Sequence, residues 1–299
     1  MCGCRATSWR SVCCDTTVSD FDSDPASLRA VAEGLAAEAA DFVRRRRAEV
    51  FGDGAPADGR RDGAVRAKST PTDPVTIVDT ETERLLRDRL AELRPGDPIV
   101  GEEEGGSADA GSGRPTWVLD PIDGTVNFLY GIEAYAVSVG VQVDGASVAG
   151  AVANVPTGEI FSAAAGQGAR VRRGDTSNPL RCNAVTSLSM ALLGTGFGYA
   201  REHRLRQAEV FAQLLPDVRD ARRVGSCALD LCMVAAGRLD AYYEDGVHVW
   251  DWAAAALIAA EAGAWLRLPP SDTSAGFIAA AAPGIAGELD TALRRVGAC

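Results

Sequence analysis

The stretch W117-V-L-D-P-I-D-G-T125 places two aspartates just after an apolar run. Three consecutive apolar residues indicate the end of a buried strand. Because Pro121 has no N–H to donate, we expect the strand to stop there and to deliver Asp120 to a sheet edge. Asp123-Gly124-Thr125 is typical of a turn and of a helix start, since Asp caps free N–H groups and Gly tolerates unusual backbone angles. An Asp-Gly pair alone favours the turn, so the rest of the chain must decide.

The composition is that of a globular protein with a sizeable core. The chain has 299 residues, 46% of them apolar and 24% charged, and a formal net charge of -11. This charge argues against nucleic acid as a partner, because affinity for the phosphate backbone rests on clustered Lys and Arg. No apolar run reaches membrane-spanning length, and the first ten residues lack the apolar segment of a secretory signal. We therefore expect a cytoplasmic protein without a membrane partner.

The eight cysteines do not form the usual pattern of a zinc site. The chain has only two histidines, which leaves few Cys/His ligand sets. Cys2, Cys4, Cys13 and Cys14 fit either a soft-metal site or an N-terminal extension without structure, and we expect the latter, with residues 1–24 as a disordered tail. Cys227 and Cys232 lie in an apolar helical pattern and are expected to pack.

Hydrophobic periodicity predicts helices at Pro25–Val50 and Thr80–Leu93, with the basic run Arg44–Arg47 solvated at the end of the first. Gly52–Gly63 is typical of a mobile loop. Apolar runs predict strands at residues 99–100, 117–119, 136–143, 148–155 and 160–163, with hairpin turns at Asp144-Gly145 and Thr157-Gly158.

The second half of the chain alternates between helices and strands. Helices are expected at about 203–215, 226–236 and 250–262 and after residue 283, with strands near 192–193, 240–243, 266 and 277–281. This order indicates an α+β half at residues 25–183 and an α/β half at 184–299, packed in layers as one unit.

Acidic residues recur where strands should end or helices begin. They are Asp73 and Asp79, Glu102 and Glu103 in G101-E-E-E-G105, Asp120 and Asp123, and Asp251 in W250-D-W252. Each alone is typical of a solvated surface. If they converge on one crevice, two like charges about 4 Å apart repel by about 4 kcal/mol at an effective dielectric constant near 20, so cations must neutralise them.

All-oxygen ligands without histidine or thiol favour Mg²⁺. Two such ions can support an in-line phosphoryl displacement, with the backbone N–H groups of Gly124 and Thr125 as a phosphate cradle. The chain has no Walker sequence, which argues against a nucleoside triphosphatase. G194-T-G-F-G198 has the wrong spacing for a dinucleotide fingerprint, which favours a close-packed strand end.

Four ordered motifs together resemble the inositol monophosphatase family, from about residue 28 to the C-terminus, with the nearest likeness to actinobacterial members. They are K68-S-T-P-T-D73 followed by V75-T-I-V-D79, then G101-E-E103, D120-P-I-D-G-T125 with N127-F128, and W250-D-W-A-A254 ending in E261-A-G263. The resemblance implies the layered αβαβα sandwich of sugar phosphatases, a homodimer and inhibition by lithium.

The resemblance also implies residue roles. The metal ligands would be Glu102, Asp120, the Ile122 carbonyl, Asp123 and Asp251, which hold two Mg²⁺ ions, with a third, weaker ion on Glu102. The catalytic residues would be Thr125 and Asp79, which orient and deprotonate the attacking water, supported by Glu102, Glu103 and Lys68. The substrate contacts would be the Gly124 and Thr125 N–H groups for the phosphate and Asp123, Cys227, Glu244 and Asp251 for the remaining polar groups.

This sequence departs from the family in three places. Trp252 is bulkier than the usual residue, and Ala254–Ala256 replace glycine found there in many relatives. Gly198-Tyr199 offers no clear polar match where some relatives contact inositol. His248 is either a positioning group for Asp251 or a packed histidine.

We interpret the chain as a Mg²⁺-dependent phosphomonoesterase that hydrolyses myo-inositol 1-phosphate through direct attack by a metal-activated water, without a phosphoenzyme. The alternative substrates are histidinol phosphate, fructose 1,6-bisphosphate and 3'-phosphoadenosine 5'-phosphate. A hypothesis of another class is a regulatory binding protein on the same scaffold.

Overall fold

The computed structural model describes residues 23–52, 64–68, 70, 73–106, 113–269 and 274–298. The cysteines of the expected tail and most of the expected loop at 52–63 lie outside these residues. The first half contains the following elements: α1 (Pro25–Phe51), β1 (Val65–Ala67), β2 (Pro74–Thr76), α2 (Ile77–Leu93), β3 (Ile99–Gly101), β4 (Pro115–Asp123), α3 (Thr125–Tyr130), β5 (Ala136–Val143), β6 (Ala146–Asn154), β7 (Glu159–Ala164), β8 (Ala169–Arg173) and β9 (Thr176–Pro179).

The second half adds a further set of helices and strands: η1 (Leu188–Met190), β10 (Leu192–Thr195), α4 (Arg201–Leu214), η2 (Leu215–Asp217), β11 (Asp220–Arg222), α5 (Cys227–Ala235), β12 (Ala241–Val247), α6 (Val249–Glu261), β13 (Trp265–Arg267), β14 (Gly276–Ala281), η3 (Pro283–Ile285) and α7 (Ala286–Arg295).

Two large sheets organise the molecule. Strands β3 to β9 form a seven-stranded sheet in sequence order, antiparallel except for the β3–β4 pair. A five-stranded mixed sheet has the order β11-β10-β12-β14-β13, in which β11, β10 and β12 are parallel. The first sheet uses hairpins and the second uses helical crossovers, as the sequence pattern predicted.

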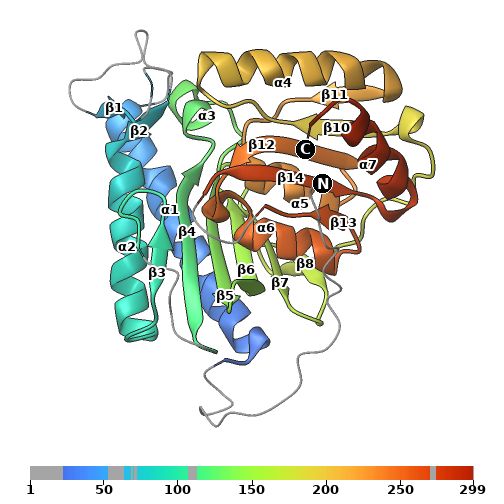
Figure 1. Cartoon of the computed structure of the whole chain (residues 1–299). Helices are drawn as coiled ribbons and strands as arrows, with labels where there is room; N and C mark the ends of the chain where they lie inside the picture. The colour runs from blue at the N-terminus through green and yellow to red at the C-terminus, as the bar shows by residue number, and fades with distance from the viewer. Residues whose placement is uncertain are drawn as a thin grey trace.

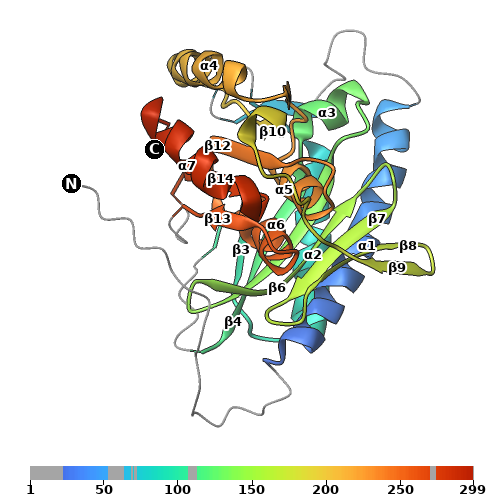
Figure 2. The same cartoon turned by 90° about the vertical axis from the view of Figure 1, so that its right-hand side faces the viewer.

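The elements stack as five layers. Figure 1 shows α1 and α2 on one side of the seven-stranded sheet, and α5 and α6 between the two sheets. Figure 2 shows α4 and α7 on the outer side of the five-stranded sheet. The expected αβαβα sandwich is confirmed. The division of the chain at residues 183 and 184 stays a prediction.

Apolar side chains fill the spaces between these layers in three clusters. Strand periodicity sorts them, because alternate residues of a strand face opposite sides of its sheet. On β5, Val137, Val139 and Val141 belong to the cluster with α1. The intervening small residues Ser138 and Gly140 face α6, where the Ser138 hydroxyl donates to the Trp250 carbonyl at 3.4 Å. The small residues let α6 approach the strands closely.

Two glycines mark the closest approach of α6 to the seven-stranded sheet. A Cβ on Gly140 would lie 2.9 Å from Ala253 Cβ, and one on Gly150 would lie 2.8 Å from Ala254 Cα. Neither distance is compatible with a normal van der Waals contact. The alanines of α6 therefore rest on bare backbone, which fixes the height of this helix above β5 and β6.

Two expectations at element ends were wrong. Pro121 does not end β4, which runs to Asp123 across a bulge between Asp120 and Asp123 that leaves Pro121 outside the ladder. Helix α2 begins at Ile77, before Asp79, because the Thr76 hydroxyl accepts from the Val78 N–H at 3.1 Å and caps the helix.

The basic run of α1 is not at the helix end, because the helix continues to Phe51. It is also not simply solvated. Arg44 donates to the Val155 carbonyl at 2.8 Å, and Arg47 donates to the Phe128 carbonyl at 3.0 Å. Arg46 pairs with Glu81 of α2 at 2.8 Å. Three of the four arginines therefore tie α1 to its neighbours.

Strands β8, β9 and β11 were not predicted. Strand β9 is fully exposed, and β8 and β11 are only partly buried. Such edge strands lack the alternation of apolar residues by which a half-buried strand is recognised.

Candidate active site

Strand β4 supplies two carboxylates to one point at the edge of the sheet. All nine residues of the strand are buried, including Asp120 and Asp123. The bulge between them turns the chain, and the Ile122 N–H donates to Asp120 Oδ1 at 3.0 Å. Without the bulge, a spacing of three residues would place the two side chains on opposite faces of the sheet. The bulge therefore brings both carboxylates to the same side.

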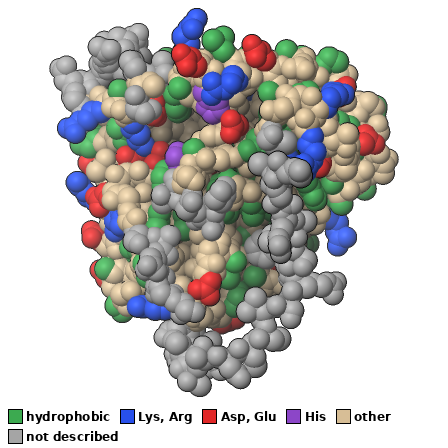
Figure 3. Space-filling view, in the orientation of Figure 1, with side chains coloured by type: hydrophobic (Ala, Val, Ile, Leu, Met, Phe, Trp, Pro, Cys, Tyr) green, Lys and Arg blue, Asp and Glu red, His purple; other side chains and the backbone are tan. Residues whose placement is uncertain are grey.

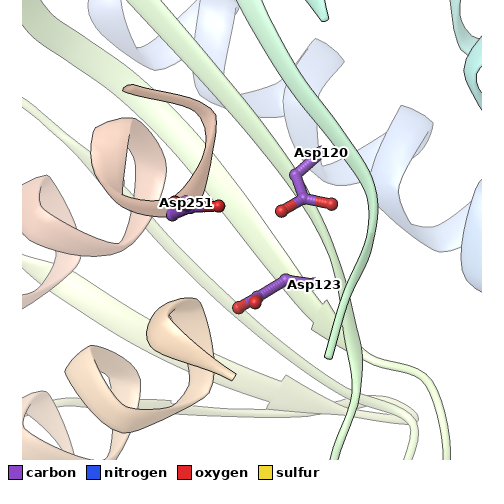
Figure 4. A group of neighbouring side chains, drawn as sticks. All are labelled: Asp120, Asp123 and Asp251. Carbon is purple, nitrogen blue, oxygen red and sulfur yellow. The ribbon is translucent and has the colours of Figure 1, made fainter. Parts of the chain in front are cut away.

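Helix α6 adds a third carboxylate from more than a hundred residues away. Asp251 lies in its first turn, and Asp251 Oδ2 accepts from the backbone N–H of His248 at 2.6 Å. One carboxylate oxygen from each of Asp120, Asp123 and Asp251 lies within 4.8 Å of the other two. Figure 4 shows the three side chains pointing toward one another from β4 and the start of α6.

The turn after β3 adds two glutamates, and the end of β1 adds a lysine. Lys68 Nζ lies 2.7 Å from Glu102 Oε1 and also pairs with Glu103. The backbone N–H of Lys68 donates to the Asp73 carbonyl at 2.8 Å, so the pairing of β1 with β2 positions the lysine. The Glu102 carboxylate also lies near Asp120, because after burial it contributes most to raising the pKa of Asp120. The structure thus joins this turn to the three aspartates.

Asp79 and Thr125 form a buried pair beside these carboxylates. The Thr125 hydroxyl lies 3.2 Å from Asp79 Oδ1 and 3.1 Å from the Ile122 carbonyl. The other oxygen of Asp79 accepts from the Thr76 N–H at 3.0 Å and from the Thr76 hydroxyl. Both Asp79 and Thr125 are therefore held in place from two directions.

Asp123 does not cap α3, as the sequence suggested, but reaches across to α5. Its Oδ2 accepts from the Ser226 hydroxyl and from the Ala228 N–H, each at 2.6 Å. The cap of α3 is instead Gly124, at φ 97°, and no side chain caps this helix. A Cβ on Gly124 would lie 3.0 Å from the Ala134 carbonyl oxygen. A glycine is therefore required both by the backbone angle and by the available space.

Cys227 and Glu244 lie on the five-stranded side of the same region. Cys227 is buried and Glu244 is half-buried, and the Tyr242 hydroxyl donates to Glu244. A Cβ on Gly196 would lie 1.9 Å from Glu244 Oε2, so the predicted close-packed strand end is confirmed at this glycine. Burial and then Glu244, Asp251 and Asp123 raise the pKa of the Cys227 thiol, which places it next to these carboxylates. Cys232 packs in the core, as expected.

Burial and mutual repulsion dominate the electrostatics of the site. Burial, followed by neighbouring carboxylates, raises the pKa of Asp120 and of Asp251 well above the usual range. Burial raises the pKa of Asp79 and of Asp123 to about 7, although hydrogen bonds from Thr76 and Ser226 lower them in part. Burial alone would lower the pKa of Lys68, but Glu102 and Glu103 outweigh it and raise the pKa.

This arrangement fits a hard divalent cation. The donors are carboxylate oxygens and the nearby Ile122 carbonyl, which suit Mg²⁺ better than zinc or copper. The raised pKa values agree with a cation site. Burial and neighbouring carboxylates disfavour the charged form of each group, and a bound cation would stabilise that form. In Figure 3, acidic side chains gather beside a histidine in the upper left of the molecule.

The sequence reasoning missed two residues that hold the site together. Glu83 is fully buried on α2 and accepts from the N–H groups of Glu103 and Glu104 at 2.7 and 3.0 Å. Its position one helical turn after Asp79 on the buried face was the available signal. Ser226 precedes an apolar helix and holds Asp123, and a serine at a helix cap was the signal there.

Comparison with known proteins decides the family. Residues 24–294 match the profile of the inositol monophosphatase family. The chain belongs to the inositol monophosphatase family. This membership confirms the expected phosphatase, and the inositol monophosphatase fold accounts for the layered sandwich described above.

Three relatives show how far the similarity extends. The inositol-1-monophosphatase of Mycobacterium bovis is 66% identical over 279 residues, which cover 92% of this chain and 96% of the relative. The solved structure of Mycobacterium tuberculosis SuhB superposes with a TM-score of 0.78 at 60% identity and covers 92% of this chain and 98% of that one. A more distant inositol monophosphatase relative, the Nus factor SuhB of Pasteurella multocida, is 35% identical over 77% of this chain and 86% of the relative.

The structure shows what His248 contacts. Its ring stacks on Trp250 at a centroid distance of 4.8 Å and an interplanar angle of 10°. Its backbone N–H holds the Asp251 carboxylate in the contact given above. Trp252 is buried in the core between the sheets, where its Nε1 has no hydrogen-bond partner among the described residues.

Proposed function

We propose that this protein is a Mg²⁺-dependent phosphomonoesterase whose substrate is myo-inositol 1-phosphate. The observation that carries the proposal is the convergence of Asp120, Asp123 and Asp251 next to the Asp79–Thr125 pair. The name of the Mycobacterium bovis relative supports the choice of substrate at 66% identity.

In this proposal Glu102, Asp120, Asp123, Asp251 and the Ile122 carbonyl hold two Mg²⁺ ions, and Glu102 holds a third ion more weakly. The ions supply a Lewis acid for the phosphate oxygens and lower the pKa of water. Lys68 fixes Glu102 and Glu103 through its ion pairs with both.

Thr125 and Asp79 orient the attacking water and accept its proton in this proposal. In this proposal the Thr125 hydroxyl donates to Asp79 Oδ1, which lies 3.2 Å away, and its lone pairs accept from the attacking water. Asp79, with a pKa of about 7, can take up the proton at neutral pH. A direct displacement of this kind needs no protein nucleophile.

The substrate would bind between the two sheets. The N–H groups of Gly124 and Thr125 begin α3 without a side-chain cap, which suits a phosphate oxygen. Asp123, Cys227, Glu244 and Asp251 would face the inositol hydroxyl groups, because the charges of the three carboxylates are all felt at the Cys227 thiol.

A phosphate-release panel tests the substrate and the metal together. Purified protein is given myo-inositol 1-phosphate, histidinol phosphate, fructose 1,6-bisphosphate and 3'-phosphoadenosine 5'-phosphate, each with and without Mg²⁺ and Li⁺. We expect Mg²⁺-dependent, Li⁺-inhibited turnover with inositol phosphate as the best substrate. A different best substrate would overturn the substrate assignment, and turnover without a divalent cation would overturn the metal site.

A regulatory binding role is the second candidate, and it is favoured by the relative that is named a Nus factor. The variant Asp120→Asn separates the two. Loss of phosphatase activity with retained binding to transcription components would show that both functions coexist, whereas an inactive wild-type protein with Mg²⁺ present would favour binding alone.

The oligomeric state and the location are also proposals. We propose a homodimer in the cytoplasm. No helix in the described part of the chain has the length and apolar character needed to cross a membrane. Light scattering of the purified protein checks the dimer, and a monomer at micromolar concentration would contradict it.

A further inference from the structure

The turn that follows β3 carries three consecutive glutamates, Glu102, Glu103 and Glu104, at the edge of the seven-stranded sheet. Two backbone hydrogen bonds of 3.0 and 3.1 Å between Gly101 and Gly105 close the turn. Adjacent like charges repel one another, so the composition of this turn favours a spread arrangement of its side chains. Contacts outside the turn must therefore set where its carboxylates lie.

The carboxylate of Glu83, on α2, lies against the backbone of this turn. Its Oε2 accepts from the Glu103 N–H at 2.7 Å, and its Oε1 accepts from the Glu104 N–H at 3.0 Å. A Cβ on Gly101 would lie 2.2 Å from Oε1, so the missing side chain of Gly101 leaves the space that the carboxylate occupies. The Glu83 carboxylate thus fills the inside of the turn, and both of its oxygens accept from backbone.

Arg87, one helical turn later, neutralises the buried charge of Glu83. Glu83 is 0% exposed, and the Arg87 guanidinium lies 2.8 Å from Glu83 Oε1. The same guanidinium donates to the Gly105 carbonyl at 2.5 Å, at the far end of the turn. An unpaired buried carboxylate would be costly. The Glu83–Arg87 pair therefore holds both ends of the turn while its own charges cancel.

A neutral side chain of the same size could not take the place of Glu83. Two N–H groups of the turn point at one carboxylate, and a glutamine offers only one oxygen. Its NH₂ group would face the second N–H, donor against donor. The position therefore requires a carboxylate, and the turn that carries Glu102 and Glu103 is what the carboxylate serves.

We propose that Glu83 and Arg87 are positioning residues for the candidate metal site, which hold the turn of Glu102 and Glu103 in its metal-binding shape before a divalent cation arrives. This inference rests on the proposed function, because it needs Glu102 to be a ligand of Mg²⁺. Glu83 acts through the backbone, since the turn engages both of its oxygens. A turn that is already in place loses less conformational freedom on binding, so the pair raises the affinity for the ion.

The first test needs no variant. Hydrogen exchange followed by NMR in the metal-free wild-type protein reports on the N–H groups of Glu103 and Glu104. We expect both to exchange at least about a hundredfold more slowly than in an unstructured chain. Exchange at the rate of an unstructured chain, followed by protection when Mg²⁺ is added, overturns the proposal, because the ion itself would then order the turn.

Glu83→Gln tests the effect on the metal. We expect the dissociation constant for Mg²⁺, measured by isothermal titration calorimetry, to rise about tenfold, since loss of a group that orients a ligand weakens metal binding by ten- to a hundredfold. The Mg²⁺ concentration for half-maximal phosphate release should rise by the same factor, while the rate at saturating Mg²⁺ changes by less than about threefold.

Leu90→Ala controls for lost stability, because Leu90 is buried on the same helix and its truncation leaves a cavity away from the turn. This variant should melt at a lower temperature and bind Mg²⁺ as the wild type does. Equal weakening in Leu90→Ala and Glu83→Gln overturns the positioning role, and so does unchanged affinity in Glu83→Gln. A wild-type protein that binds no Mg²⁺ overturns instead the proposed function.

Gly101→Ala reaches the same turn from the other side, because the added Cβ would displace the Glu83 carboxylate. Alone, it should also weaken Mg²⁺ binding about tenfold. In a Glu83→Ala background, which leaves room for the Cβ, the same change should have an effect of less than about threefold, so the two losses are not additive. Additive losses contradict the proposal. If the variants do not fold, hydrogen exchange in the wild-type protein decides.

Discussion

Glu83 and Asp120 are both carboxylates with almost no exposed surface, at 0% and 1%, yet their surroundings differ completely. Glu83 faces donors, since it accepts from two backbone N–H groups and pairs with Arg87 at 2.8 Å. Asp120 accepts from one N–H and otherwise faces Glu102, Asp123 and Asp251. Burial alone therefore does not distinguish a carboxylate that stabilises the fold from one that we propose binds metal. The groups around the carboxylate, hydrogen-bond donors or other carboxylates, distinguish the two.

The largest effect is expected at the carboxylate that faces others. Asp120→Asn keeps the size of the side chain but removes a ligand charge, so we expect phosphate release to fall by roughly a thousandfold, which corresponds to about 4 kcal/mol. Without metal, the thermal unfolding temperature should not fall, because one source of repulsion is gone. The control Asp217→Asn removes a carboxylate that pairs with Arg295 near the surface. A loss of activity below tenfold in Asp120→Asn contradicts the assignment.

The opposite pattern is expected at the carboxylate that faces donors. Glu83→Gln breaks a buried ion pair and should lower the free energy of unfolding by about 3 kcal/mol, or the melting temperature by about 5 °C. Glu81→Gln is the matched control on the same helix, since Glu81 pairs with Arg46 while 28% exposed, and should cost less than about 1 kcal/mol. Equal costs in the two variants would show that the buried ion pair of Glu83 is no more stabilising than the half-exposed pair of Glu81. Calorimetry measures both.

The dependence of stability on pH reports on the buried carboxylates of the candidate site without mutation. The raised pKa values of Asp79 and Asp123, each about 7, mean that the metal-free folded protein keeps protons that the unfolded chain releases near pH 4. This contribution is fully present below pH 4 and is lost as the pH rises through about 7. Each group should contribute a loss of about 1.4 kcal/mol per pH unit within that window.

Mg²⁺ should reverse this trend, because it takes the place of the protons. The increase in melting temperature on adding Mg²⁺ should therefore grow from pH 5 to pH 8. Scanning calorimetry with and without chelator checks it. A Mg²⁺ effect that is the same at both pH values contradicts the proposed cluster.

The smallest effect concerns how Asp251 is positioned. Gly150→Ala pushes a Cβ against Ala254 and should cost about 1 to 3 kcal/mol, with a several-fold loss of activity if α6 is displaced. Gly34→Ala is the matched control, because nothing lies within 4 Å of the added Cβ on α1. That change should be neutral or stabilise the protein by up to about 1 kcal/mol. Unchanged stability in Gly150→Ala would contradict the close approach.

The sequence predicted the layers of the fold and the side chains that meet at the site. It did not predict the hydrogen bonds that hold those side chains in place. Apolar periodicity located α1, α6 and the central strands, because their buried faces repeat at a fixed interval. It could not locate β8, which is partly buried, or β9, which is exposed, because their residues have no such repeat. The motif D120-P-I-D-G-T125 indicated two carboxylates, yet the bulge that turns them to one side depends on pairing with β5.

The contacts of Asp123 could not be predicted for a related reason. A local rule assigned it to the helix that follows, and the structure gives it to Ser226 and Ala228, about a hundred residues later. Asp123 could accept from the N–H groups at the start of α3 or of α5, and long-range packing, not the local sequence, decides between them. The same holds for Glu83, whose partners belong to a turn that its own helix does not specify.

Asp79 and Asp251 each close the first turn of a helix by accepting from a backbone N–H three residues earlier. The same two side chains thus cap helices in the fold and, in the proposed function, take part in catalysis and metal binding. A descendant of this protein that lost its activity would still be under pressure to keep both aspartates for the sake of α2 and α6. Their presence in a sequence is therefore weak evidence of turnover, and Asp120, which begins no helix, is the more informative position to inspect.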